Sequence, residues 1–198
     1  MSTADERDSL TRRGFWLEYA SMAWMTVEAA VATAAGIVAS SIALIAFGLD
    51  SVVEFAAGAI VIWQLRGGSS QREHRAVRLI GVTFFLLAAY LVIESIRDLI
   101  SQARPEASTA GLIVTAAALL VMPLLALAKQ RTGQALGNQT LITDAAESKL
   151  CALTSGAALL GVGLNVWLGW WWADPAAALV IAALAVREGL EAWENDGD

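Results

Sequence analysis

The chain has 198 residues, of which 57% are hydrophobic and only 16% are charged, and its mean hydropathy is +0.59. Disordered and collagen-like chains are excluded, and a soluble enzyme of this length is disfavoured because its core cannot take up so many apolar residues. The net charge is -6. Several acids lie inside apolar stretches, which disfavours nucleic acid as a partner and favours a lipid bilayer as the surroundings.

Six apolar segments predict an all-α membrane protein built as a six-helix bundle, because a helical span needs about 20 residues. Their expected bounds are about residues 15–37, 40–64, 76–99, 109–129, 140–168 and 171–192. Residues 1–14 are expected to form a cytoplasmic tail, 15–192 the transmembrane domain, and 193–198 a short cytoplasmic tail with no soluble carboxy-terminal domain after it. The first two segments meet at Ser40 and Ser41 with almost no loop, which predicts a tight helical hairpin.

The distribution of basic residues predicts that both termini are cytoplasmic in a multi-pass protein of the cell membrane. With the amino terminus inside, only Arg97 and Arg104 fall on the outer side, and Lys149 is left as the basic residue deep in a span. The residues then assigned to the inner side are Arg7, Arg12, Arg13, Arg66, Arg72, Arg75, Arg78, Lys129, Arg131 and Arg187.

Two acids in the second segment form the first half of a candidate metal site. Asp50 and Glu54 are four residues apart, so they share one face of a helix, and both fall near the middle of the span. Two carboxylates on one face in hydrocarbon repel each other and need protons or a cation between them. Metal or proton chemistry is therefore favoured over a pairing with basic side chains.

The fifth segment supplies the second half of this site. Glu147 and Cys151 are also four residues apart and lie at a similar depth. If this face meets that of Asp50 and Glu54, three carboxylates and a thiolate form a four-ligand cage for a divalent metal. Cys151 is the single cysteine, so no intrachain disulfide forms, and taken alone it fits a small buried apolar residue as well as a ligand.

Five other ionisable residues are not assigned to the metal site, and their expected roles are either structural or undecided. Glu28 is interpreted equally as a further ligand or proton carrier and as a hydrogen-bonded buried acid. Glu18 falls nearer a span end, where water reaches it. Asp144 is expected either to pair with Lys149 or to line the inner entrance, and Lys149 to neutralise an acid. Asp174 precedes a proline, which favours a helix cap.

With these residues in place, the chain resembles the transmembrane domain of the cation diffusion facilitator family. The similar motifs are Ser41–Glu54 in the second segment, Glu147–Ser155 in the fifth, and Trp172–Pro175 running to Arg187–Gly189 in the sixth. The resemblance implies six spans, inside termini, a homodimer, and a metal site with one pair of ligands on each of the second and fifth spans. Zinc-transporting members usually offer His or Asp and then Asp, whereas this chain offers Asp50 and Glu54, then Glu147 and Cys151.

The predicted function is therefore divalent cation transport, with no enzymatic activity and no permanently bound cofactor. Carboxylates and one thiolate favour Zn²⁺ as the substrate and also fit Cd²⁺, Co²⁺ or Fe²⁺. Efflux by alternating access with proton antiport is implied by the resemblance and fits ligands that lose protons on binding metal. Two alternatives stay open, namely a non-transporting scaffold or metal sensor with the same fold, and a proton-coupled carrier of another small cation.

Overall fold

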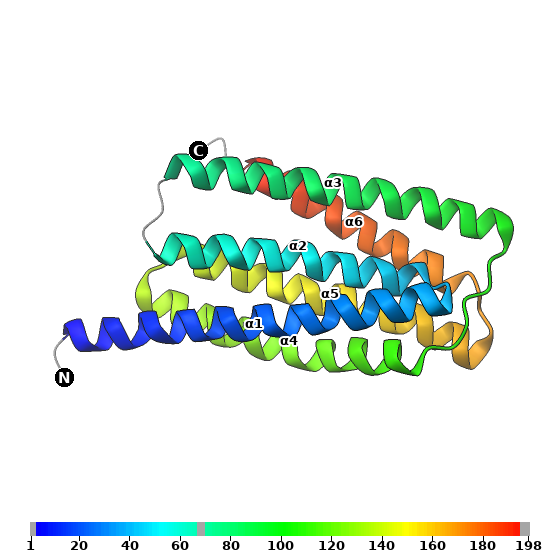
Figure 1. Ribbon diagram of the computed structural model, residues 1–198, viewed down its shortest axis with the longest axis horizontal. Helices are drawn as coiled ribbons and strands as arrows, with labels where there is room; N and C mark the ends of the chain where they lie inside the picture. Colours follow the sequence, from blue (N-terminus) through cyan, green and yellow to red (C-terminus); the bar gives the residue numbers. More distant parts are fainter. Residues whose placement is uncertain (1–2, 67–69, 195–198) are drawn as a thin grey trace.

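The structure is a computed structural model that describes residues 3–66 and 70–194. In this part of the chain it contains six helices and no strand, which confirms the predicted all-α bundle. The helices are α1 (Thr3–Ala39), α2 (Ile42–Leu65), α3 (Ser70–Ser101), α4 (Thr109–Leu136), α5 (Gln139–Leu168) and α6 (Ala173–Glu194). They run side by side along the long axis of the molecule, and the two ends of the chain lie toward the same end of the bundle (Figure 1).

Three helices extend well beyond the segments expected from the sequence, and one of them, α3, begins at Ser70 rather than near residue 76. Helix α1 begins at Thr3 and so includes most of the stretch assigned to the amino-terminal tail, and α4 continues to Leu136 rather than ending near residue 129. The expected break at residues 66–72 and the expected tail 193–198 fall in part outside the described residues. The added length of α4 changes the surroundings of its lysine, as described below.

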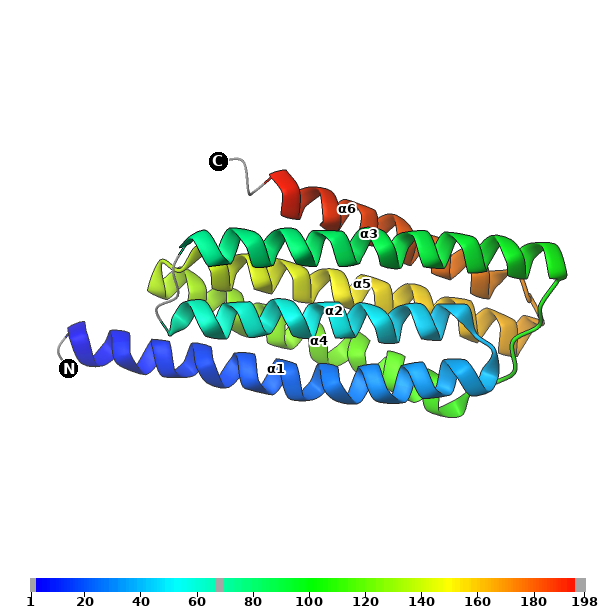
Figure 2. The same cartoon turned by 45° about the horizontal axis from the view of Figure 1, so that its top comes forward.

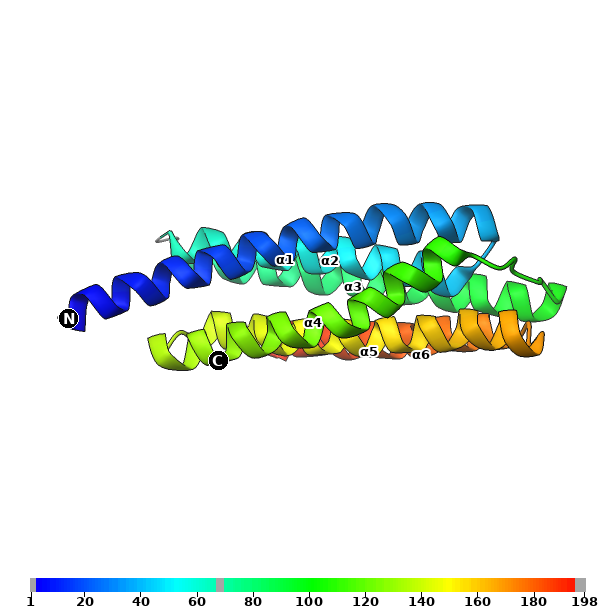
Figure 3. The same cartoon turned by 90° about the horizontal axis from the view of Figure 1, so that it is seen from below.

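Helix α2 occupies the centre of the bundle. It contacts α1, α3, α5 and α6, while α4 packs against α5 and α1, and α3 packs against α6. Figure 3 shows α1, α2 and α3 in one layer and α4, α5 and α6 in a second, with α4 rising toward α1 at one end. Figure 2 shows α3 and α6 together at one side of the bundle. Side chains of α2 that face the second layer therefore meet those of α5 and α6.

Apolar side chains face outward and several charged side chains face inward, as in a protein surrounded by lipid. Large apolar side chains point outward, such as Val38 with 82% of its surface exposed, Ile100 with 79% and Leu120 with 71%. Charged side chains are buried instead, and these are Glu18, Glu28, Asp50, Glu54, Lys129, Asp144 and Asp174. A soluble protein buries such groups only when they are paired and does not cover its surface with aliphatic residues. The arrangement therefore indicates a membrane-embedded bundle with a polar interior.

Four of the described helices contain stretches long and apolar enough to cross a membrane. These stretches are Arg7–Ala39, Ile42–Trp63, Thr109–Leu136 and Asp144–Leu168. Helices α3 and α6 fall outside this set and pack against each other beside α2. Their sequences contain several charged residues, and two helices that share an interface do not each need a fully apolar surface.

The predicted hairpin between the first two segments is present and is fixed by an acid from α6. Ser40 takes a left-handed conformation with φ of 54°, and Ser41 N donates to Gly36 O at 2.9 Å. The Asp174 carboxylate accepts from Ser41 Oγ at 2.5 Å and from Ala43 N at 3.2 Å. Asp174 therefore acts as a cap, as predicted from the sequence, but the helix that it caps is α2.

A close approach of α1 and α2 fixes the rotation of α2 and hence the direction of its acids. A Cβ atom added at Gly48 would lie 2.3 Å from Thr33 Oγ1 and 2.8 Å from Thr33 N. Only glycine fits between the two backbones at this point, as is common where helices pack closely in lipid. Asp50 and Glu54 follow on the same helix and line a cavity whose other walls come from α3, α5 and α6.

Candidate metal-binding cavity

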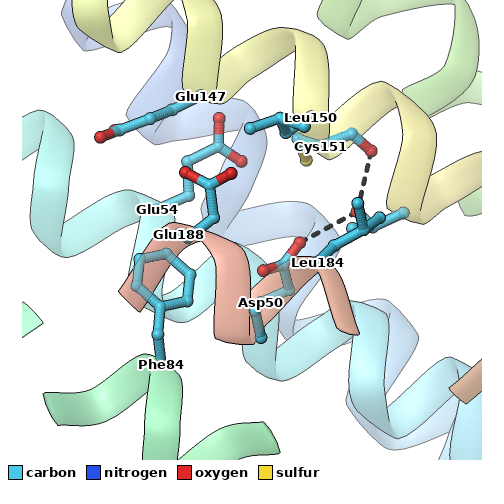
Figure 4. A pocket seen from close by; sticks show the side chains of 10 residues that line it. Asp50, Glu54, Phe84, Glu147, Leu150, Cys151, Leu184 and Glu188 are labelled. Carbon is cyan, nitrogen blue, oxygen red and sulfur yellow. Dashed lines mark hydrogen bonds between the residues drawn. The ribbon is translucent and has the colours of Figure 1, made fainter. Parts of the chain in front are cut away.

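The four predicted ligands line one cavity in the interior of the bundle. Its walls come from α2, α3, α5 and α6, and the lining residues are Asp50, Glu54, Phe84, Glu147, Leu150, Cys151, Thr154, Leu184, Ala185 and Glu188. The free volume is about 20 Å³, which holds a single water-sized species. The two faces predicted from the spacing of four in α2 and α5 therefore meet around one small, partly polar space (Figure 4).

Asp50 is held in position by a residue of α5. Its side chain is buried, and Thr154 Oγ1 lies 2.9 Å from Asp50 Oδ2 and 3.0 Å from the carbonyl oxygen of Cys151. The Thr154 hydroxyl has a single proton, which it can donate to only one of these two acceptors at a time. The Asp50 carboxylate therefore has further lone pairs that can bind a ligand in the cavity. A hydrogen bond of this kind orients a ligand for metal binding.

Glu54 lies deeper in the same cavity and has fewer partners. Only 5% of its surface is exposed, and neither carboxylate oxygen accepts from an N–H or O–H group in the described part of the chain. Its polar neighbour is the thiol of Cys151, which is a weak donor. A buried carboxylate without strong donors is costly, and a cation in the cavity would remove this cost.

In the conformation described here the ligands surround the cavity without closing into a coordination sphere. Among the described residues, no group of three or more His, Cys, Asp or Glu side chains lies close enough together to hold a metal ion. Figure 4 shows the Glu147 carboxylate extending away from the carboxylates of Glu54 and Glu188, and the other acids of the cavity do not form such a group either. The four-ligand cage of Asp50, Glu54, Glu147 and Cys151 thus stays a prediction.

One acid in the cavity was not among the predicted ligands. Glu188 reaches it from α6, and its Oε1 atom is shielded from solvent and has no hydrogen-bond partner among the described residues. The sequence alone gives little indication that Glu188 is a ligand. It lies next to Arg187 near the end of the sixth segment, where charged residues are common at a membrane interface. Only the packing of α6 against α2 and α5 brings Glu188 inward.

A second buried group of charges, which does not line the cavity but interacts electrostatically with Glu54 and Glu147, corrects two expectations. Lys129 is fully buried, 3.2 Å from Glu18 Oε2 and in contact with Asp144, and Ser148 Oγ lies 3.4 Å from its Nζ. The expectations that Lys129 faces the inner solution and that water reaches Glu18 are therefore wrong. The first followed from placing the end of the fourth span near residue 129, whereas α4 continues well beyond it. The second followed from placing the start of the first span near residue 15, whereas α1 begins at Thr3.

Lys149 and Glu28 also take definite positions. Lys149 is exposed and its Nζ donates to Gln130 Oε1 at 2.8 Å. The pairing expected between Asp144 and Lys149 is therefore wrong, and Lys129 pairs with Asp144 instead. Glu28 is fully buried and accepts from Ser51 Oγ at 3.2 Å, and it does not line the cavity. Of its two interpretations, the structure therefore favours the hydrogen-bonded buried acid.

Comparison with known proteins adds a family match that covers most of the chain. Residues 19–195 match the cation efflux transmembrane domain. The chain is 25% identical over 193 residues to Transmembrane protein 163 of Xenopus laevis, a match that spans 94% of this chain and 68% of the relative. It is 28% identical over 129 residues to each of two proteins named cadmium, cobalt and zinc/H(+)-K(+) antiporter, from Bacillus velezensis and Bacillus subtilis. These two matches span 65% of this chain and 41% of each antiporter, so the chain corresponds to less than half of their length.

Proposed function

The chain belongs to the cation efflux family, and from this premise we propose that it carries divalent metal cations across a membrane, with Zn²⁺ as the favoured substrate and protons as the exchanged ions. The family is one of transporters and not a class of enzymes. The observation that supports this function best is the cavity in which Asp50 and Glu54 of α2 face Glu147 and Cys151 of α5. The printed names of the two antiporters support the same class of substrate.

The acid–base chemistry of the cavity residues determines in which direction metal is exchanged for protons. Carboxylates and a thiol bind a divalent metal only after they lose their protons, so metal binding and proton binding compete for Asp50, Glu54, Glu147 and Cys151. Where the solution is less acidic, the metal displaces protons. Where it is more acidic, protons displace the metal. A bundle that opens the cavity to each side in turn therefore moves metal toward the more acidic side while protons move the opposite way.

The remaining parts of the proposal concern the setting of the protein. We place it in the cell membrane as a homodimer with both termini on the cytoplasmic side, so that the metal leaves the cell. The excess of basic residues assigned to the inner side supports this orientation. The start of α1 and the end of α6 at the same end of the bundle agree with it (Figure 1). Cd²⁺, Co²⁺ and Fe²⁺ suit the same set of ligands and are proposed as further substrates.

Flux of Zn²⁺ into proteoliposomes under an imposed pH gradient tests this function. We expect uptake that saturates with Zn²⁺ concentration and is accelerated when the vesicle interior is the more acidic side. Collapse of the gradient with a protonophore is the matched control and is expected to slow the uptake. Absence of Zn²⁺ flux from correctly inserted, folded protein would contradict the proposal and favour a scaffold or sensor, whereas intact proton flux that ignores Zn²⁺ would favour a carrier of another cation.

A further inference from the structure

The sixth helix contributes one acid to the wall of the cavity. Of the lining residues, α6 supplies Leu184, Ala185 and Glu188, and only the last of these is ionisable. The position of α6 is fixed by close packing on α3, since a Cβ atom added at Gly189 would lie 2.9 Å from Phe85 Cζ. Glu188 is thus held at the cavity by the residue next to it in sequence.

Glu188 of α6 and Glu54 of α2 line the same small cavity (Figure 4). Glu54 is more than nine-tenths buried and both of its oxygens are without an N–H or O–H donor in the described part of the chain. Glu188 as a whole is half-buried, but its Oε1 atom is shielded from solvent and has no donor there. Carboxylates that line one small cavity and lack donors repel each other when ionised, and a cation in the cavity would compensate their charges.

The basic residue beside Glu188 does not neutralise it. Arg187 is exposed, and its Nε donates to Glu191 Oε1 at 2.7 Å on the outer face of α6. The buried Lys129 is paired with Glu18 and Asp144 and does not line the cavity. The charge of Glu188 is therefore available to a ligand in the cavity.

We propose that Glu188 is a ligand for the transported cation, which it binds from α6 together with Asp50 and Glu54 of α2. The inference rests on the proposed transport function and adds a third helix to a site otherwise drawn from α2 and α5. Three carboxylates give an oxygen-rich set of ligands, which favours harder cations such as Mn²⁺ beside Zn²⁺, whereas Cys151 favours soft Cd²⁺. Glu188 then determines which metal is preferred, because it adds an oxygen ligand and so lowers the relative contribution of the Cys151 thiolate.

Equilibrium metal binding to the full chain in detergent micelles tests this assignment. Mn²⁺, Zn²⁺ and Cd²⁺ are titrated separately by isothermal calorimetry into the wild type, Glu188→Gln and Glu191→Gln. The last variant is the matched control, because it removes a half-exposed acid one turn further along α6 that is paired with Arg187 and does not line the cavity. We expect Glu188→Gln to weaken Mn²⁺ and Zn²⁺ binding by at least about tenfold, with a smaller loss for Cd²⁺, and Glu191→Gln to match the wild type.

A change in the visible absorption spectrum of bound Co²⁺ in Glu188→Gln, absent from Glu191→Gln, would further support direct ligation. If Glu188→Gln does not fold, Glu188→Asp keeps the charge on a shorter side chain and is expected to give weaker binding and an altered Co²⁺ spectrum. Wild-type affinity and spectrum in the folded Glu188 variant would overturn the inference and leave the transport function standing. A wild-type chain that binds none of the metals would overturn both.

Discussion

Replacement of the buried lysine by an apolar residue, Lys129→Met, is expected to lower the free energy of unfolding by about 3–5 kcal/mol. Lys129 is the basic partner of both Glu18 and Asp144, and all three side chains are shielded from solvent. Its removal leaves two carboxyl groups in the bundle without a counter-charge, and such groups must take up protons or stay ionised at a high cost. Unfolding of the purified protein in detergent, followed by circular dichroism, measures the loss.

Lys149→Met is the control for this prediction, because Lys149 is exposed and bonded only to Gln130 in the described contacts. A surface substitution of this kind is expected to change the free energy of unfolding by no more than about 0.5 kcal/mol. Neutralising the partners in the triple variant Lys129→Met, Glu18→Gln, Asp144→Asn should restore much of the stability, because no uncompensated charge remains. Equal stability of Lys129→Met and Lys149→Met would show that the ion-pair group does not hold α1, α4 and α5 together.

Loss of the acids of α2 is expected to abolish metal transport while the fold survives. Asp50→Asn keeps the shape of the side chain and an oxygen for Thr154 but removes the charge. Because the metal loses an anionic ligand, we expect Zn²⁺ flux to fall by more than about tenfold, and Glu54→Gln to have a similar effect. The double variant Asp50→Ala, Glu54→Ala should show no flux above that of empty vesicles.

Glu106→Gln serves as the matched control in these flux measurements, since Glu106 is an exposed acid in the connection between α3 and α4. It should transport as the wild type does. Detergent stability and vesicle insertion of each variant are measured in parallel, so that a misfolded protein is not taken for an inactive one. Transport that persists in the folded double variant would remove the cavity as the transport site.

The parts of the fold that the sequence predicted well are those that depend on local pattern. Runs of apolar residues indicated six helices, and the spacing of four put Asp50 with Glu54 and Glu147 with Cys151 on single faces, each of which lines the cavity. The absence of a loop at Ser40 predicted the hairpin of α1 and α2. These features follow from hydrophobicity and helical periodicity, which act within one segment.

The parts that were missed depend on which helices pack together. Lys129 lies close to the expected end of a span, and a lysine there reaches water unless the helix continues and acids from α1 and α5 enclose it, as Glu18 and Asp144 do. Glu188 was not singled out, because the local pattern around it does not show that α6 packs against α2 and α5. Asp174 was predicted as a helix cap from the proline that follows it. This local pattern does not indicate which helix is capped, and the structure shows that it is α2.

The location of the bound metal tests the central claim most directly. Crystals of the protein grown with Zn²⁺ and measured on either side of the zinc absorption edge give an anomalous map that identifies the ion. We expect one strong peak in the cavity, with carboxylate oxygens of Asp50 and Glu54 at about 2.0–2.2 Å from it. A peak beside Lys129, or peaks confined to the surface of a protein that transports Zn²⁺, would contradict the account.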